Sequence, residues 1–310
     1  MGELIVNSRS TRNIPHVSGP ISLHGRSSCR EASKREGTYV FMKARLVDST
    51  ARLATWRAAA CRVSLFEVPC IVTSPPGGHC DALVNPANEK LEGTQFTPSE
   101  CSRLLAPATT IIYPSQAVDG LVTDLGGPEL ANACRELSGV PTGGAAITPA
   151  FGELLMCYTH IVHACAPFFD KDNLQRWRSK LEACYLAAFA SADEAGLRVL
   201  ALPLLGAGAR GAPAASAAAV AAAAAASWRA PQGSGWATSV KQAPVDEMRP
   251  PRGYLREMRF AVQDPGVAHV FSEAMDEHAA LQRESPARRR EARADWDSHW
   301  RSGRQWDGSL

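Results

Sequence analysis

Residues 200–213, LALPLLGAGARGAP, constrain the fold more than any other stretch of this chain. Their leucines form a short apolar run, which predicts a β-strand covered on both faces. The run ends in a turn whose backbone can adopt positive φ and approach a ligand closely, because it contains Gly206, Gly208 and Gly211. Pro213 suits the first turn of a following helix. Such a helix start favours an anion such as phosphate, although the pattern also fits a strand-to-helix connection without a ligand.

The remainder of the chain alternates predicted strands with predicted helices. Apolar runs bounded by turn residues predict strands at residues 62–72, 81–84, 143–148, 158–165 and 258–262. The spacing of apolar residues predicts helices at 118–137, with a break at 126–128, and at 173–195 and 267–281. The alanine run at 214–226 predicts a helix packed close to the sheet. Residues 39–60 fit a strand-like or a helical lead-in, with residues 51–60 the better helix candidate. This alternation indicates an α/β domain with a mixed, largely parallel sheet.

The composition favours one domain with extensions rather than two domains. The 310 residues are 45% hydrophobic, which is enough for a sizeable core. We expect the domain to cover residues 62–282, with a proline-containing insertion at 94–116 and a loose loop at 230–251. Residues 1–36 are expected to form a disordered extension, residues 37–61 a lead-in segment, and residues 283–310 a charged tail.

Charge and cysteine content limit the possible partners and compartments. The formal net charge is +2 with both signs well represented, so the bulk charge does not indicate nucleic-acid binding. Nine cysteines without a CxxC pair indicate reduced thiols and an intracellular, cytoplasmic or nuclear setting. Arginines and serines near the start leave organelle targeting open. The sequence has no apolar run of about 18 residues, so no membrane segment is expected. We expect a monomer.

The sequence predicts no metal and no cofactor. His160 and His163 are three residues apart on a predicted strand, which directs them to opposite faces. The pair His79 and Cys80 lacks further ligands at zinc spacing. Residues 206–211 also match a bare GxGxxG, but no acidic residue follows about twenty residues later, which argues against a dinucleotide-binding fold.

Five separated motifs resemble those of one family, the macro domains. Residues 81–88, DALVNPAN, resemble its DAIVNxAN signature, and residues 118–120 resemble its VDG. Residues 143–151, GGAAITPAF, and 161–167, IVHACAP, are similar to two further segments of the family. The stretch at 200–213 resembles its P-x-L-G-T-G-x-x-G-x-P loop. The resemblance covers residues 62–280 and implies a three-layer αβα sandwich that binds ADP-ribose, free or attached to protein.

The resemblance also implies roles for individual residues. Asn88 would hydrogen-bond the distal ribose, because an amide carries both donors and an acceptor for a diol. Asp119 would lie beside the ribose, where hydrolytic members use an aspartate to orient water. Asp81 and Asn85 would be structural. The diphosphate would be bound mainly by backbone N–H groups of the two loops, which comprise Val118, Asp119, Gly120, Gly206, Ala207, Gly208, Ala209, Arg210 and Gly211.

Departures from the family pattern keep three functions open. The glycine run that precedes VDG in hydrolytic members is replaced here by the long segment ending at residue 117. Arg210 stands where an aromatic residue is usual, and Ser74 stands where an acidic residue is usual. The NPxNE motif is more similar to that of divergent members, the ganglioside-induced differentiation-associated proteins. We therefore expect an ADP-ribose-binding module. The alternatives are a hydrolase of mono-ADP-ribosyl protein or O-acetyl-ADP-ribose, and a scaffold with a degenerate cleft.

Overall fold

The computed structural model describes residues 50–58, 60–93, 117–229 and 253–283, together with Ala294 and Ser298. All of them belong to one compact unit, residues 46–310. The predicted extension at 1–36, the insertion at 94–116, the loose loop at 230–251 and nearly all of the predicted tail lie outside the described residues.

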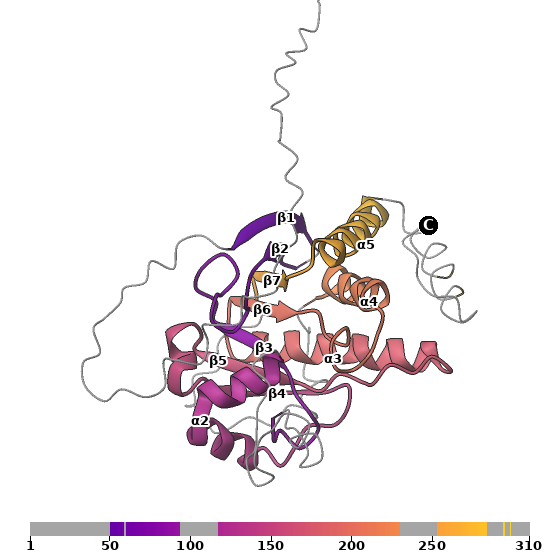
Figure 1. Cartoon of the computed structure of the whole chain (residues 1–310). Coiled ribbons are helices and arrows are strands. Elements are labelled where there is room, and N and C mark those ends of the chain that lie inside the picture. The colour runs from indigo at the N-terminus through magenta and orange to yellow at the C-terminus, as the bar shows by residue number, and fades with distance from the viewer. Residues whose placement is uncertain are drawn as a thin grey trace, which may run out of the picture. The chain divides into compact units, whose positions relative to one another are not determined.

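A seven-stranded sheet runs through the described part of the chain in the order β1-β2-β7-β6-β3-β5-β4 (Figure 1). The inner strands β2, β7, β6, β3 and β5 are parallel, and the edge strands β1 and β4 are antiparallel to their neighbours. The prediction of a mixed, largely parallel sheet is therefore confirmed. The strands are β1 (Ala51–Arg57), β2 (Arg62–Glu67), β3 (Ala82–Pro86), β4 (Ala145–Pro149), β5 (His160–Ala164), β6 (Val199–Pro203) and β7 (Glu257–Val262).

Helices cover both faces of the sheet, which gives the expected three-layer αβα sandwich. One core cluster joins one sheet face to α3 (Leu174–Glu194), α4 (Ala214–Ser227) and α5 (Pro265–Arg283) (Figure 1). A second core cluster joins the opposite face to α2 (Val118–Glu136) and the 3-10 helix η1 (Gly152–Met156). Inside α2, Gly127 has φ 64° and ψ −161°, so the predicted break at residues 126–128 is confirmed.

The alanine-rich helix α4 is buried almost all round. Its residues from Ser216 to Ala226 are all buried, and it packs against both α3 and α5. Alanine combines the best helix propensity with a small side chain, so this helix can approach its neighbours closely. The prediction of a tightly packed helix is confirmed.

Two expectations near the start of the domain are wrong. Residues 51–57 form strand β1, not a helix, because they pair with β2 and Trp56 of β1 donates to Asp276 of α5 at 2.6 Å. These tertiary contacts override the helix propensity of an alanine-containing segment. Strand β2 ends at Glu67, and Ile71 and Val72 instead lie in a turn, where they join the second core cluster.

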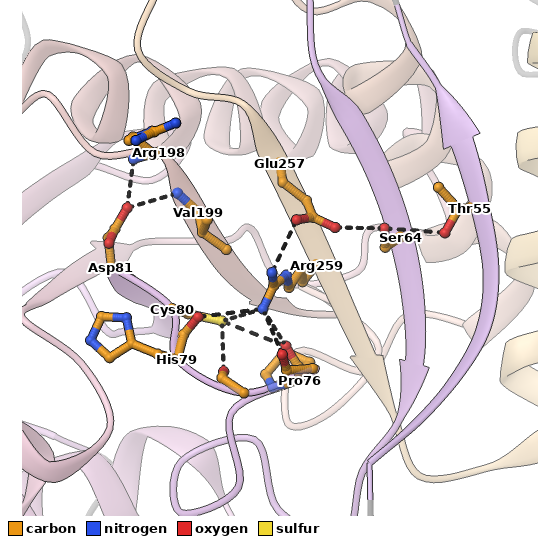
Figure 2. Close-up of polar contacts among 12 residues, drawn as sticks. Thr55, Ser64, Pro76, His79, Cys80, Asp81, Arg198, Val199, Glu257 and Arg259 are labelled. Atoms are coloured by element: carbon orange, nitrogen blue, oxygen red, sulfur yellow. Dashed lines mark hydrogen bonds and ion pairs between the residues drawn. The ribbon is translucent and has the colours of Figure 1, made fainter.

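Arg259 of β7 fixes the long connection from β2 to β3 against the sheet (Figure 2). Its guanidinium donates to the carbonyl oxygens of Pro76 at 3.0 Å and Gly77 at 3.1 Å. It also forms an ion pair of 3.0 Å with Glu257, which accepts a hydrogen bond from Ser64 at 2.8 Å. Burial alone would raise the pKa of Glu257, but the hydrogen bonds from Arg259 and Ser64 lower it below the ordinary value.

Candidate functional site

The candidate site lies at the carboxyl edge of the parallel strands. Strand β3 lies between β6 and β5, and the segments that follow these strands are residues 87–93, 204–213 and 165–173. The chain continues from β3 to α2 on one face of the sheet, and from β5 and β6 to α3 and α4 on the other face. Loops that leave neighbouring strands toward opposite faces open a crevice between them, which is where α/β sheets bind ligands.

The helices that start at this edge differ in how their first N–H groups are satisfied. Asn173 caps α3 by accepting from the backbone N–H of Arg176 at 3.1 Å. Asp264 accepts from the backbone N–H of Gly266 at 2.6 Å in the first turn of α5. By contrast, neither α2, with Ala117 at its N-cap, nor α4, with Pro213, has a side-chain cap. The helices without caps are the two that follow the adjacent strands β3 and β6.

The second glycine loop has the backbone that the sequence predicts. Gly206 and Gly211 have φ of 88° and 79°, in the left-handed region that favours glycine. A Cβ atom added at Gly208 or Gly211 would meet nothing within 4 Å, so the outer side of the loop is open. Hydrogen bonds from Gly211 N to Gly208 O at 2.9 Å and from Ala212 N to Gly206 O at 3.0 Å close the turn. The loop is therefore ordered and presents its backbone to solvent.

Arg210 neither points to solvent nor pairs with a carboxylate of the described residues. Its guanidinium stacks on Phe168, with the central carbon 4.3 Å from the ring centroid, and donates to the carbonyl oxygen of Ala87 at 3.0 Å. The Arg210 carbonyl also accepts from the backbone N–H of Phe169 at 2.8 Å. Arg210 thus ties the loop after β6 to the loop after β5 across the end of β3, and leaves a positive charge at the crevice.

Asn88 shapes its own loop. Its Nδ2 donates to Gly93 O at 2.9 Å, and its Oδ1 accepts from Glu92 N at 3.1 Å. Leu91 between them has φ 60°, an unusual value for a residue other than glycine. Contact of Asn88 with a ribose stays a prediction.

Asp119 is a buried carboxylate in the first turn of α2, where the helix dipole favours negative charge. Its Oδ1 accepts a hydrogen bond of 2.8 Å from Asn85 Nδ2. Its neighbours Val118 and Gly120 are half-buried and buried, respectively. Asp81, at the other end of β3, accepts from the backbone N–H groups of Arg198 and Val199 at 2.7 and 2.9 Å, as a structural residue would.

A buried polar group behind Asp119 was not predicted from the sequence. His163 lies 3.3 Å from Asn85 Nδ2 through Nδ1, and 3.0 Å from Thr148 Oγ1 through Nε2. Burial lowers the pKa of His163 to about 4, so the ring is neutral at neutral pH. Asn85 and His163 are paired in register on the adjacent strands β3 and β5. The signal in the sequence was a polar residue inside each of two otherwise largely apolar strands, Asn85 in β3 and His163 in β5.

A cavity of about 180 Å³ lies between α2 and the loop after β3. It is lined by Asn85, Leu91, Gly93, Asp119, Cys134 and His163, among others. Among the described residues, Asp119 is the one predicted ligand-binding residue that lines this cavity.

Within the described residues, no three His, Cys, Asp or Glu side chains are grouped to hold a metal ion, and no helix is long and apolar enough to cross a membrane. Burial raises the pKa of the Cys134 thiol to about 12, so this cysteine is a protonated core residue.

The fold is an αβα sandwich. At the carboxyl edge of its sheet, two helices start without a side-chain cap beside a glycine loop, an arrangement that suits an anionic ligand. The family model of the Macro domain matches residues 84–221, which include β3 and the whole second glycine loop. This segment of the chain is therefore similar to the Macro domain family.

Relatives and solved structures agree with this assignment. The chain is 34% identical over 134 residues to the macro domain-containing protein RSc0334 of Ralstonia nicotianae, which covers 43% of this chain and 64% of that protein. It is 35% identical over 149 residues to the non-structural polyprotein p200 of rubella virus (strain Therien), covering 47% of this chain but 6% of the polyprotein. The chain thus spans less than two thirds of either relative.

Among solved structures, the Oceanobacillus iheyensis macrodomain with MES bound has a TM-score of 0.51 and 18% identity, covering 74% of this chain and 97% of that one. A variant of the same macrodomain with ADPR has a TM-score of 0.51 and 18% identity, covering 73% and 98%. At this level of identity the likeness concerns the fold.

Proposed function

We propose that the crevice binds ADP-ribose, free or attached to protein. The observation that carries the proposal is the pair of helix starts without side-chain caps, on α2 and α4, after the adjacent strands β3 and β6. Backbone N–H groups at two helix starts that have no capping side chain, beside an open glycine loop, suit the two charges of a diphosphate. The family match and the solved structure of a macrodomain of the same fold with ADPR support this ligand.

In this proposal different residues bind different parts of the ligand. Backbone N–H groups of Val118, Gly120 and the second loop, which is Gly206, Ala207, Gly208, Ala209, Arg210 and Gly211, bind the diphosphate. The Arg210 guanidinium adds a charge that the backbone lacks. Because phosphate binding by a cation is screened by salt, affinity should fall as ionic strength rises. Asn88 and Asp119 lie toward the ribose.

Titration calorimetry with ADP-ribose tests the proposal. Gly208 is the position to change, because a Cβ there meets nothing within 4 Å and the fold is undisturbed. Gly208→Glu places a carboxylate beside the diphosphate, and Gly208→Gln is the neutral control of the same size. We expect the Glu variant to bind at least about ten-fold more weakly than the Gln variant, which corresponds to about 1.4 kcal/mol. Equal affinities, or a wild-type protein that shows no binding at millimolar ligand, would contradict the proposal and favour a degenerate scaffold.

One observation favours hydrolysis as a second candidate. Asp119 lines a cavity of about 180 Å³, room for about six waters, so a water beside a bound ribose could reach its carboxylate. The assay is release of ADP-ribose from mono-ADP-ribosylated protein, or of acetate from O-acetyl-ADP-ribose. Loss of turnover in Asp119→Ala with binding retained would support an enzyme. A wild-type protein that binds both substrates and converts neither would exclude it.

A further inference from the structure

The Asn85 amide is oriented from behind by His163. One hydrogen of Nδ2 points to Asp119 Oδ1 at 2.8 Å and the other to His163 Nδ1 at 3.3 Å. An amide nitrogen only donates, so His163 Nδ1 must be the accepting nitrogen and the ring proton must be on Nε2. Nε2 lies 3.0 Å from Thr148 Oγ1 and 3.6 Å from the Cys134 sulfur, where it can donate. The ring is therefore held in one tautomer, and the amide in one orientation.

This orientation leaves one strong acceptor without a partner. Asn85 is 2% exposed, and its Oδ1 is buried with no hydrogen-bond partner among the described residues. An unpaired buried carbonyl is costly, and most such groups in proteins are paired. Asn85 also lines the cavity that Asp119 lines. An amide and a carboxylate side chain that line one small cavity suit a ligand that donates hydrogen bonds, such as a sugar with neighbouring hydroxyls.

The cavity has the size of a ligand fragment. Its volume of about 180 Å³ equals about six water molecules, whereas pockets for whole drug-sized ligands start at about 300 Å³. It therefore suits a single sugar ring better than an entire nucleotide. The described residues that line this cavity include none from the second glycine loop, so the cavity and the diphosphate loop are separate parts of the site.

We propose that Asn85 Oδ1 accepts a hydrogen bond from a hydroxyl of the terminal ribose, and that His163 is the positioning residue that orients this amide and, through it, Asp119. The proposal rests on the proposed function, because the ribose is that of ADP-ribose. The sequence predicts a structural role for Asn85, whereas this proposal assigns it a contact with the ligand. In this proposal His163 does not contact the ligand itself, but hydrogen-bonds the Asn85 amide that does.

Calorimetry with two ligands separates this proposal from the proposed function. ADP lacks the terminal ribose, so it reports on the diphosphate loops alone. We expect Asn85→Ser and His163→Phe to weaken ADP-ribose roughly ten-fold, the fold-change of about one buried hydrogen bond, and to leave ADP unchanged. His163→Gln, whose amide oxygen can still accept from Asn85, should recover part of the loss. His160→Gln, on the same strand and half-buried, is the matched control and should change neither affinity.

The outcomes are distinct. If the wild-type protein binds neither ligand, the proposed function fails. If it binds both and the variants keep the full ADP-ribose affinity, or lose ADP and ADP-ribose equally, the positioning role is overturned. For variants that do not fold, NMR on the wild-type protein replaces them. We expect His163 in the Nε2–H tautomer and an Asn85 side-chain amide signal that shifts with ADP-ribose but not with ADP. The Nδ1–H tautomer, or equal shifts with both ligands, would overturn the proposal.

Discussion

Acidification should destabilise this protein through His163. Burial lowers the pKa of this ring from 6.5 to about 4, and among the described residues no carboxylate is paired with it directly. The groups around it are the Asn85 amide, the Thr148 hydroxyl and the protonated thiol of Cys134, with Asp119 reached only through Asn85. Between pH 6.5 and 4 the unfolded chain therefore binds a proton that the folded chain does not. Stability is then fully present above pH 6.5 and falls as the pH is lowered.

The size of the effect follows from the two pKa values. One pKa unit corresponds to about 1.4 kcal/mol, so the contribution of His163 approaches about 3 kcal/mol in strong acid and is about 2.5 kcal/mol at pH 4.5. The assay is urea unfolding at several pH values from 7.5 to 4.5, followed by the fluorescence of the buried Trp177. We compare the wild-type protein with His163→Gln, which cannot titrate.

The test depends on the difference in slope, not on the absolute stability of the variant. His163→Gln should lose stability at pH 7.5 but should show a shallower fall toward pH 4.5, by about 2.5 kcal/mol over the range. His79→Gln, at an exposed histidine, should keep the wild-type slope. Parallel curves for wild type and His163→Gln would refute the reasoning, because they would mean that His163 does not titrate differently in the folded and unfolded chain.

Four further predictions concern other parts of the domain. Gly77→Ala should lower the free energy of unfolding by about 2 kcal/mol or more, because φ is 69° and the added Cβ would lie 2.7 Å from the Phe66 ring. Gly78→Ala, with φ 91° and open space around it, should cost about 1 kcal/mol in the same urea experiment. Tyr185→Phe should cost about 1–3 kcal/mol, since its hydroxyl is the partner of a buried backbone N–H at 2.8 Å. Ala117→Asp should cap α2 and stabilise the free protein by about 1 kcal/mol, while calorimetry should show weaker ADP-ribose binding.

Most of the fold could be predicted because periodicity and turn chemistry agree with the tertiary structure. The glycines at 126–127 marked the break in α2, and Asn173 and Gly196 marked the ends of α3, where Gly196 has φ 75°. Strand β1 could not be predicted in the same way. Its residues are mostly exposed and carry no alternating pattern, so its conformation is set by the edge of β2, which the local sequence does not contain.

The candidate site could be located but not assembled from the sequence. The motifs lie around β3, β5 and β6, which are adjacent and parallel in the sheet, and contact of their loops with a ligand stays a prediction. They did not indicate that Arg210 would reach Ala87, which is 123 positions earlier in the chain, or stack on Phe168. Contacts of this kind depend on the order of β6, β3 and β5 in the sheet, and strand order is a property of the topology.

The pattern of local costs supports the placement of the site. The missing side-chain caps of α2 and α4, the buried Asn85 Oδ1 and the positive φ of Leu91 each carry a local cost in stability. These features follow β3 and β6, whereas α3 and α5 are capped by side chains and the opposite end of β3 is held by Asp81. Elsewhere in the described residues, Ser138 also has a positive φ and the buried Arg259 Nε has no hydrogen-bond partner. The 3-10 helix η1 also lacks a side-chain cap, at Phe151, but it follows the antiparallel edge strand β4. The α-helices without caps are the two that follow the neighbouring strands β3 and β6, which supports a ligand at these helix starts and explains why a cap that stabilises the free protein should weaken binding.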